Sequence, residues 1–276
     1  MQISVVIPVY NRQHTLKRAL DSVMQQSSPA DEVIVVDDGS TDQSADIVSK
    51  HFPQVRLLRQ PNKGVSAARN AGIRSASSDW IALLDSDDEW LPQKLATVRD
   101  AFGSHPQEVL FHSDEIWIRD GVRVNAMNKH RKRGGMIFEY CLPLCVISPS
   151  AAVIHRSVFD RVGLFNEALP ACEDYDLWLR LCQCLPVFYI DRPLIRKYGG
   201  HADQLSRKYW GMDRFRIRAL HALMQQPGLT PQQQQQTQDM IVRKLGILIK
   251  GARKHQNHAV LEEFEPLLTH YQSSTC

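Results

Sequence analysis

Residues 81–88, Ile-Ala-Leu-Leu-Asp-Ser-Asp-Asp, decide the fold because an apolar run passes directly into three aspartates. The run predicts a buried strand, and Val33 to Val36, followed by Asp37-Asp38-Gly39-Ser40, predicts a second one. Carboxylates at the exits of neighbouring parallel strands converge on one edge of a sheet, where open α/β folds bind ligands. Like charges crowded there repel unless a cation or a hydrogen-bonded ligand compensates them. We therefore expect a divalent metal and a phosphate-bearing substrate at this edge.

Strand and helix signals alternate through the first hundred residues. The expected strands cover residues 3–9, 33–36, 55–58 and 80–84, and the expected helices cover 16–24, 40–48 and 64–76, with another opening at Pro92. Ser40 and Gln43 make a plausible capping box for the second helix. Strands separated by ten- to fifteen-residue helices need crossover connections, so the pattern predicts a doubly wound, mostly parallel α/β sheet.

The pattern changes after about residue 109. Two strands are expected at 109–111 and 116–118, ending in a turn at Asp120-Gly121, and the basic segment Lys129–Gly135 is expected to be a mobile loop. Short helices at 157–163 and 173–184, a strand at 187–190, and the segment 193–198, which leads to Gly199-Gly200-His201, complete this half. Helices at 209–224, from Thr230 onward and at 259–268 form a C-terminal appendage in which no chemistry is evident. The expected domains are 1–204, with halves 1–105 and 106–204, and a helical region 205–276.

Composition narrows the class of protein. The chain has 276 residues, of which 43% are hydrophobic and 23% charged, as in an ordinary globular protein. Its formal net charge of +3 is too small to indicate nucleic acid, but it suits an anionic substrate or an anionic membrane surface. Met1 leads almost directly into the first strand and no long apolar run follows, so we expect a cytoplasmic protein with at most peripheral membrane contact. The six cysteines are expected to be reduced.

The aspartates after the strands point to metal and nucleotide chemistry. Asp85 and Asp87 share one face of an extended segment, and hard oxygen donors of this kind suit magnesium or manganese. A capped turn, with Asp88 or Glu89 opening the next helix, is the alternative, although three aspartates exceed what a cap needs. Asp38 is favoured as a ligand contact, whereas Asp37 fits a ligand contact and a cap equally well.

Five motifs give the chain a family resemblance. In order they are Val6–Asn11, Val35–Asp42, Asn62–Asn70, Leu84–Asp88 and Glu173–Trp178. With these motifs the sequence resembles family-2 glycosyltransferases of the GT-A fold, across about residues 3–205. The resemblance implies an inverting transfer of a sugar from a nucleotide-diphosphate sugar, such as a UDP-sugar, in cell-surface polysaccharide synthesis. The implied acceptor is a glycan or a lipid-linked saccharide, and nucleic acid is not an expected partner.

The resemblance also implies roles for single residues. Pro8 and Tyr10 would line the base pocket, Asp38 would hold the nucleoside, and Arg69, with Lys63 nearby, would reach the ribose or diphosphate. Asp85 and Asp87 would bind Mn²⁺ or Mg²⁺ beside the sugar nucleotide. Asp88 and His201 would be additional metal ligands. Glu173 and Asp174 would form the catalytic pair, with Asp174 as the base.

Several alternatives stay open from the sequence alone. Glu173 and Asp174 also suit simple charge stabilisation of a helix start, and His201 also suits a structural role. The segment Lys129–Arg133 fits a solvated surface loop and an acceptor-side loop that gathers a diphosphate or phospholipid equally well. A nucleotidyltransferase lacks support because Pro8-Val9-Tyr10-Asn11 contains no glycine-rich signature. A catalytically idle sugar-nucleotide-binding protein is disfavoured by the intact Asp85, Asp87 and Asp174.

Overall fold

The computed structural model describes residues 1–125, 130–200 and 209–273. Its strands are β1 (Ile3–Val9), β2 (Glu32–Asp37), β3 (Arg56–Arg59), β4 (Trp80–Leu83), β5 (Glu89–Trp90), β6 (Leu110–Arg119), β7 (Val122–Val124), β8 (Val153–His155) and β9 (Phe188–Gly199). Its helices are α1 (Leu16–Met24), α2 (Ser44–His51), α3 (Val65–Ser75), α4 (Lys94–Ser104), α5 (Phe138–Cys141), α6 (Arg156–Val162), α7 (Glu173–Cys182), α9 (Asp213–Met224), α10 (Pro231–Lys254) and α11 (His258–Ser273), with a 3₁₀ turn, η2, at Pro149–Ala151.

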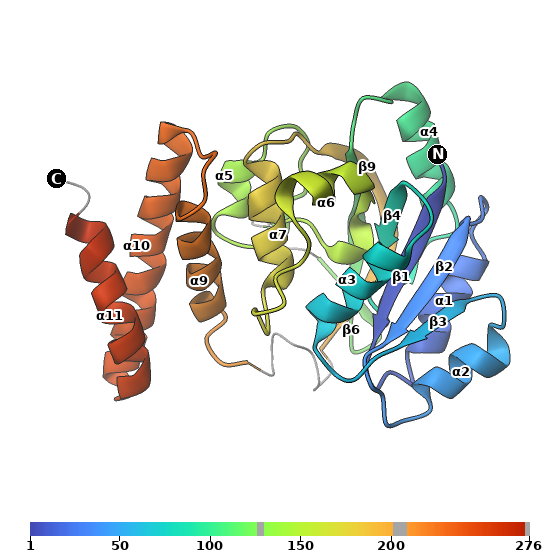
Figure 1. Cartoon of the computed structure of the whole chain (residues 1–276), viewed down its shortest axis with the longest axis horizontal. Helices are drawn as coiled ribbons and strands as arrows, with labels where there is room; N and C mark the ends of the chain where they lie inside the picture. Colours follow the sequence, from blue (N-terminus) through green and yellow to red (C-terminus); the bar gives the residue numbers. More distant parts are fainter. Residues whose placement is uncertain (126–129, 201–208, 274–276) are drawn as a thin grey trace.

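The strands form one mostly parallel sheet in the order β3-β2-β1-β4-β8-β6-β9-β5, with β7 paired to β6. The strands β1 to β4 are mutually parallel, and β8 is inserted antiparallel between β4 and β6. Helices α3, α6 and α7 cover one face, and α1, α2 and α4 pack against the other, each with its own apolar core (Figure 1). The predicted doubly wound α/β sheet is confirmed.

Two of the predicted strands are parts of one continuous strand, and another is longer than expected. The strands expected at 109–111 and 116–118 fall in β6, which begins at Leu110, and the strand expected at 187–190 begins at Phe188 and continues through 193–198 as β9. The two strands run parallel, and register shifts around Asp114 absorb their irregularities, including Pro193. The polar residues that interrupt each apolar run therefore lie within the strands rather than between them.

The predicted capping box at Ser40 is wrong. Helix α2 begins at Ser44, and its N-cap residue Gln43 makes no side-chain cap bond. The Ser40 hydroxyl instead accepts a hydrogen bond from Asn11 N at 2.9 Å, so it ties the end of β1 to the turn after β2. Asp42, which precedes the N-cap residue, accepts a hydrogen bond from the N–H of Ser44, the first residue of α2, at 2.9 Å.

The basic segment predicted as a mobile loop is anchored where the structure describes it, from His130 onward. Lys132 is buried, and its Nζ lies 3.2 Å from Glu115 Oε1 and donates to Val146 O at 2.9 Å. Gly135 pairs with Val187 through both its backbone N–H and its carbonyl. The segment is a loop, as expected, but Lys132 is not solvated, because the buried carboxylate of Glu115 supplies a partner that composition alone does not reveal.

Helix α3 lies unusually close to β1. A Cβ on Gly72 would be 2.3 Å from Cγ1 of Val6, nearer than any normal contact. Only glycine permits this approach without displacing the helix. The same helix carries Arg69 one turn earlier, so the Gly72 contact sets how far Arg69 stands from the sheet.

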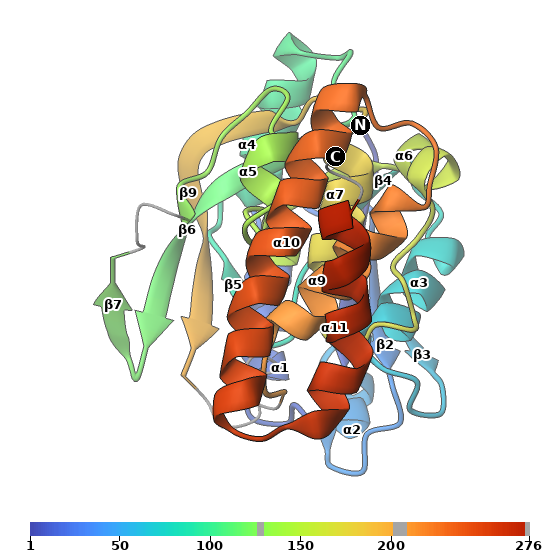
Figure 2. The ribbon, with the colours of Figure 1, turned by 90° about the vertical axis from the view of Figure 1, so that its left-hand side faces the viewer.

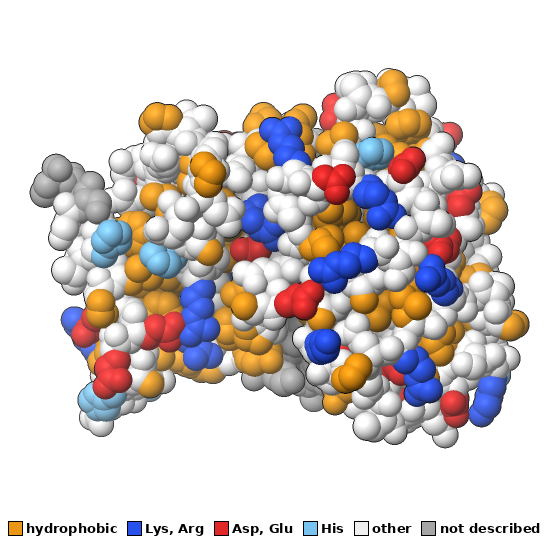
Figure 3. Space-filling model, in the orientation of Figure 1, with side chains coloured by type: hydrophobic (Ala, Val, Ile, Leu, Met, Phe, Trp, Pro, Cys, Tyr) orange, Lys and Arg blue, Asp and Glu red, His pale blue; other side chains and the backbone are white. Residues whose placement is uncertain are grey.

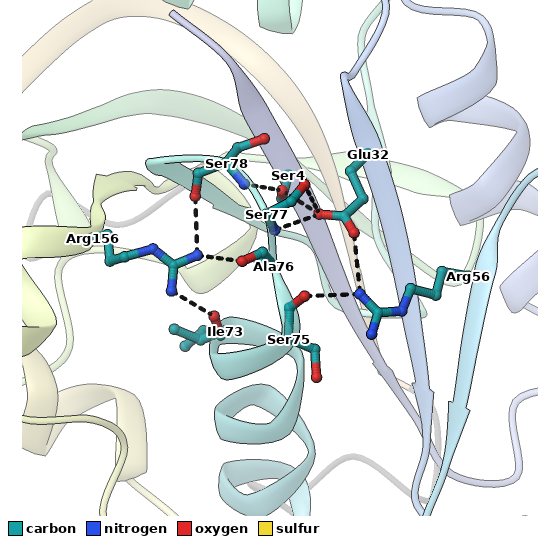
Figure 4. Close-up of polar contacts among 9 residues, drawn as sticks. All are labelled: Ser4, Glu32, Arg56, Ile73, Ser75, Ala76, Ser77, Ser78 and Arg156. Carbon is teal, nitrogen blue, oxygen red and sulfur yellow. Dashed lines mark hydrogen bonds and ion pairs between the residues drawn. The ribbon is translucent and has the colours of Figure 1, made fainter.

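The far end of the sheet, where β1 and β2 begin, holds a separate polar cluster (Figure 4). The buried Ser4 hydroxyl donates to Glu32 Oε2 at 2.6 Å and accepts from Ser78 N at 3.2 Å. Glu32 Oε2 also accepts from Ser77 N at 2.8 Å, and Arg56 joins Glu32 Oε1 to the end of α3. These contacts bind the first two strands to the loop that precedes β4.

The C-terminal helices pack beside α7, with α10 and α11 outermost (Figure 2). Helix α10 starts with a full capping box between Thr230 and Gln233, and α11 extends further than expected, to Ser273. None of the described helices is long and apolar enough to cross a membrane. Figure 3 shows lysines, arginines and carboxylates interspersed over one face rather than gathered by sign.

Candidate active site

A cleft opens at the carboxyl ends of β1 and β4. Its lining comes from both halves of the sheet and from the C-terminal helices: Pro8, Arg12, Val65, Arg69, Asp85, Ser86, Asp87, Asp88, Cys145, Pro149, Ala171, Cys172, Glu173, Asp174, Tyr175, Lys197, Tyr198, Met212 and Arg216. Asp85 to Asp88, here called the acidic turn, follow β4 directly and close a turn through Asp88 N to Asp85 O at 3.1 Å. Of the carboxylates expected to converge, those of the acidic turn line this cleft together with Asp174, whereas Asp37 and Asp38, after β2, lie outside its lining.

Asp88 faces inward and is already hydrogen-bonded on both oxygens. Its Oδ2 accepts from the Ser150 hydroxyl at 2.6 Å, and its Oδ1 accepts from Tyr198 N at 3.1 Å. Burial, together with the neighbouring Asp87 and Asp85 charges, raises the pKa of Asp88 to about 8, although the Lys197 cation and the Ser150 hydrogen bond oppose the shift. Helix α4 begins only at Lys94, so neither Asp88 nor Glu89 caps it. Asp88 therefore joins the acidic turn to η2 and to the end of β9.

Arg69 holds the two acidic motifs together from α3. Its Nη2 lies 2.7 Å from Asp85 Oδ1 and its Nη1 lies 2.6 Å from Glu173 Oε1, with the guanidinium 4% exposed. Burial raises the pKa of Glu173, and the Arg69 cation opposes that shift. Because both terminal nitrogens of Arg69 contact carboxylates, it links the acidic turn to α7.

Helix α7 presents Asp174 to the cleft. Glu173, Asp174 and Asp176 lie in its first turn, where the helix dipole stabilises negative charge. Asp174 is half-buried, and its Oδ2 accepts from Cys145 Sγ at 3.2 Å. Trp178 and Leu181, on the same helix, are buried in the core as predicted. The helix thus combines a packed apolar side with a carboxylate end that faces the cleft.

Two cations of the cleft were not foreseen from the sequence. Lys197, near the end of β9, donates to Ser148 Oγ at 2.9 Å. Burial alone would lower the pKa of Lys197, but Asp88, Glu115, Asp85 and Asp174 together raise it, so its ammonium stays charged. Arg216 reaches the cleft from α9, which corrects the expectation that the C-terminal helices carry no chemistry. A lysine after an apolar strand and an arginine in an amphipathic helix give no distinctive signal.

Comparison with known proteins identifies the family. A family model described as "Glycosyl transferase family 2" matches residues 4–163, more than half of the chain. The chain belongs to glycosyltransferase family 2. An uncharacterized glycosyltransferase of Rickettsia felis is 26% identical over 217 residues, covering 75% of this chain and 35% of that protein. Another from Haemophilus influenzae is 28% identical over 195 residues, covering 66% of this chain and 62% of that protein. The chain spans about a third of the length of the Rickettsia relative.

Solved structures place this family-2 glycosyltransferase in the GT-A fold. S. aureus TarS 1–349 in complex with UDP-GlcNAc superposes with a TM-score of 0.71 at 19% identity, covering 89% of this chain and 72% of that one. The same TarS fragment in complex with UDP gives a TM-score of 0.63 at 20% identity, covering 89% and 71%. At this identity the likeness establishes the fold alone.

The residues predicted to bind a metal in this family-2 glycosyltransferase differ in how accessible they are to a ligand in the cleft. Asp85, Asp87 and Asp88 all line the cleft, but both oxygens of Asp88 accept hydrogen bonds from within the protein, and His201 lies outside the described residues. Among the residues that the structure describes, no group of three His, Cys, Asp or Glu side chains forms a ready cage. Magnesium and manganese commonly take one or two carboxylates and complete their shell with substrate phosphates and water. Asp85 and Asp87 fit that donor set.

The predicted nucleotide-sugar residues divide into two groups. Pro8, Arg69 and Asp85 line the cleft, whereas Tyr10, Asp38 and Lys63 lie outside its lining. Asp38 is buried, and it accepts hydrogen bonds from Lys63 N at 2.9 Å, Gly64 N at 2.8 Å and Gln60 Nε2 at 2.7 Å. Asp38 thus fixes the loop between β3 and α3. Tyr10 is 45% exposed beside the end of β1.

Proposed function

We propose that this protein is an inverting glycosyltransferase that moves a sugar from a nucleotide-diphosphate sugar, a UDP-sugar, to a hydroxyl group. Asp85 and Asp87 would hold a divalent metal, and Asp174 is the general base. The acceptor is a glycan or lipid-linked saccharide in cell-surface polysaccharide synthesis, met at the inner face of a membrane. The transferred group is a hexosyl or N-acetylhexosaminyl unit.

The observation that carries this proposal is that the acidic turn and the start of α7 line the same cleft. Asp85 and Asp87 enter it from β4, Asp174 enters it from α7, and Arg69 fixes the two motifs relative to each other. The TarS structures, which share the fold, were solved with UDP-GlcNAc and with UDP, and this supports a uridine donor.

The chemistry follows from these positions. Asp174 accepts the proton of the acceptor hydroxyl while that oxygen forms a bond to the anomeric carbon. The bond from this carbon to the diphosphate oxygen breaks at the same time, so the nucleoside diphosphate leaves from the opposite face and the configuration inverts. A divalent cation, when bound, offsets the negative charge that grows on the diphosphate. Lys197 and Arg216 add fixed positive charge to the same cleft.

A small amphipathic surface supports an acceptor at a membrane. The Arg133 guanidinium lies 4.1 Å from the ring centroid of Tyr140, and Met136, between them in sequence, is 58% exposed. An arginine, an aromatic ring and an exposed methionine together suit contact with an anionic headgroup and its adjoining acyl chain. This surface lies in the half of the chain expected to face the acceptor.

A donor screen tests the proposal. Thermal unfolding is measured with UDP-sugars, GDP-sugars and dTDP-sugars, each with Mn²⁺ and with EDTA, because a ligand that binds the folded state raises the melting temperature. We expect stabilisation by UDP-sugars that requires Mn²⁺, together with slow release of UDP by hydrolysis. The anomeric configuration of the product, read by NMR, decides inversion. Stabilisation without any turnover would favour a binding protein, and release of pyrophosphate from a nucleoside triphosphate with a sugar phosphate would favour a nucleotidyltransferase.

A further inference from the structure

Ser150 lies directly behind the acidic turn. Its side chain is fully buried, and its hydroxyl accepts a hydrogen bond from Asp85 N at 3.1 Å while donating to Asp88 Oδ2 at 2.6 Å. A backbone N–H can only donate, so the single hydroxyl proton is directed at the carboxylate. One side chain therefore joins the first and the last residue of the turn that carries Asp85 and Asp87.

The 3₁₀ turn that carries Ser150 is itself held on three sides. Trp90 Nε1 donates to Ser150 O at 2.8 Å, and Lys94 Nζ donates to Ala151 O at 2.6 Å. Lys197 Nζ donates to the hydroxyl of Ser148, just before the turn, at 2.9 Å. The Ser150 hydroxyl is thus presented from a support that the neighbouring strands and helices fix in place.

We infer that Ser150 is a positioning residue that sets the conformation of the acidic turn, so that Asp85 and Asp87 line the cleft while the carboxylate of Asp88 is held against η2 and the end of β9. This role rests on the proposed function, because it acts through the carboxylates that would hold the metal. Ser150 is not part of the cleft lining and touches neither metal nor substrate. Its effect is transmitted through Asp88 and the backbone of Asp85.

Removing the hydroxyl leaves two buried groups without partners. Asp88 Oδ2 loses its donor and Asp85 N loses its acceptor, and the turn can satisfy them only by changing its conformation. Residues that orient metal ligands from behind typically change metal affinity by about 10- to 100-fold when they are replaced. A loss of this size in metal affinity, rather than in folding, is what distinguishes a positioning role from a purely structural one.

The chain contains a matched control for this substitution. Ser4 is also fully buried, donates to a carboxylate oxygen at 2.6 Å and accepts a backbone N–H at 3.2 Å, but it lies at the far end of the sheet (Figure 4). Ser4→Ala removes the same two kinds of hydrogen bond without touching the acidic turn. The difference between Ser150→Ala and Ser4→Ala therefore isolates the effect of position.

The experiment titrates Mn²⁺ in the presence of UDP and measures free Mn²⁺ by electron paramagnetic resonance, with thermal unfolding of each variant alongside. We expect Ser150→Ala to raise the dissociation constant for Mn²⁺ by at least about tenfold, and Ser4→Ala to leave it within about twofold, at comparable losses of melting temperature. If Ser150→Ala does not fold, Ser150→Cys and Ser4→Cys take their places, with a smaller loss expected only at position 150. Equal affinities for a matched pair overturn the role of Ser150 alone. A wild-type protein that binds no Mn²⁺ with UDP overturns the proposed metal site and this role with it.

Discussion

Sγ of Cys145 lies 3.2 Å from Oδ2 of Asp174, and the thiol donates its hydrogen to this carboxylate. The same Sγ is 3.0 Å from Ile147 O, so one hydrogen has two acceptors within reach. Burial and the neighbouring Asp174 raise the pKa of Cys145 well above its usual value, and the thiol therefore remains a donor at neutral pH. Cys145 restrains the proposed base without an added charge.

Replacing Cys145 should affect turnover more than donor binding. We expect Cys145→Ala to lower kcat by about 2- to 10-fold, as loss of one ordinary hydrogen bond would, with the KM for the donor unchanged. Cys145→Ser, which keeps a donor, should recover most of the rate. Cys184→Ala is the control, because that thiol contacts only carbonyls at the end of α7. A serine variant as slow as the alanine variant would argue against the hydrogen bond.

Asp174→Asn separates chemistry from binding. The amide cannot take the acceptor proton, so we expect kcat to fall by about 10²- to 10⁴-fold. UDP binding in the presence of Mn²⁺, measured by calorimetry, should stay within a few-fold of wild type. If UDP binding and turnover fall together, Asp174 binds the sugar nucleotide and is not the general base.

Asp87→Ala should remove metal-dependent donor binding. A ligand present at 100 times its dissociation constant stabilises the folded state by about 2.7 kcal/mol, and this gain should vanish in the variant. The measurement is the melting temperature with UDP and Mn²⁺, compared with EDTA. Asp46→Ala is the control, because its side chain is 67% exposed on α2, away from the cleft. If the Asp87→Ala variant is still stabilised by UDP and Mn²⁺, residues other than Asp87 must bind the metal.

Arg69→Ala should destabilise the fold as well as the site. It leaves the buried Glu173 without its counter-ion, and breaking a buried ion pair in this way costs about 3–5 kcal/mol. Arg74→Ala, on the same helix, should change stability by less than about 0.5 kcal/mol because its contact with Glu167 is long and exposed. Urea unfolding of the two variants measures both values. Similar small losses in the pair would mean that Arg69 is not the link between the acidic motifs.

Lys94 should give the protein a pH-dependent stability. Burial lowers the pKa of Lys94 from 10.5 to about 7, so between these values the unfolded chain binds more protons than the folded one. Stability from this group therefore rises with pH across that window, by at most about 1.4 kcal/mol per pH unit. Urea unfolding at pH 7, 8 and 9 should show the rise in wild type but not in Lys94→Met. Lys50→Met, at an exposed site, should follow wild type, and parallel curves for wild type and Lys94→Met would contradict the assignment.

The local sequence pattern was sufficient to predict the strands, turn and helix that surround the cleft. It did not predict the long-range hydrogen bonds that connect them. The β1 and β4 strands, the acidic turn and the start of α7 each have their own apolar run or charge signature, and all are where the sequence predicts them. The inward position of Asp88 depends on Ser150, which is 62 residues away and reaches the turn only because β8 is inserted antiparallel beside β4. No local pattern encodes such a contact.

Buried charge was the other source of error. In the sequence Lys132 belongs to a basic run that is typical of a solvated loop, yet in the structure it is buried and forms an ion pair with Glu115. Arg69, which the resemblance assigns to the donor, lines the cleft and also pairs with Asp85 and Glu173, two partners that the sequence did not indicate. Its small neighbours Ala67, Ala68 and Asn70 were a usable signal, since small residues around an arginine indicate a helix face pressed against other structure. The sequence names the charges but not their partners.

The glycine at position 72 makes the chemistry of this enzyme sensitive to a site that it never touches. A single added methyl group would have to push α3 outward from Val6, and the helix would carry the Arg69 guanidinium with it. The carboxylates of Asp85 and Glu173, which that guanidinium holds together, would then move apart. Variation within this helix is therefore constrained by tenths of an ångström, and a catalogue of residues in contact with the substrate would overlook one of the places where activity is most easily lost.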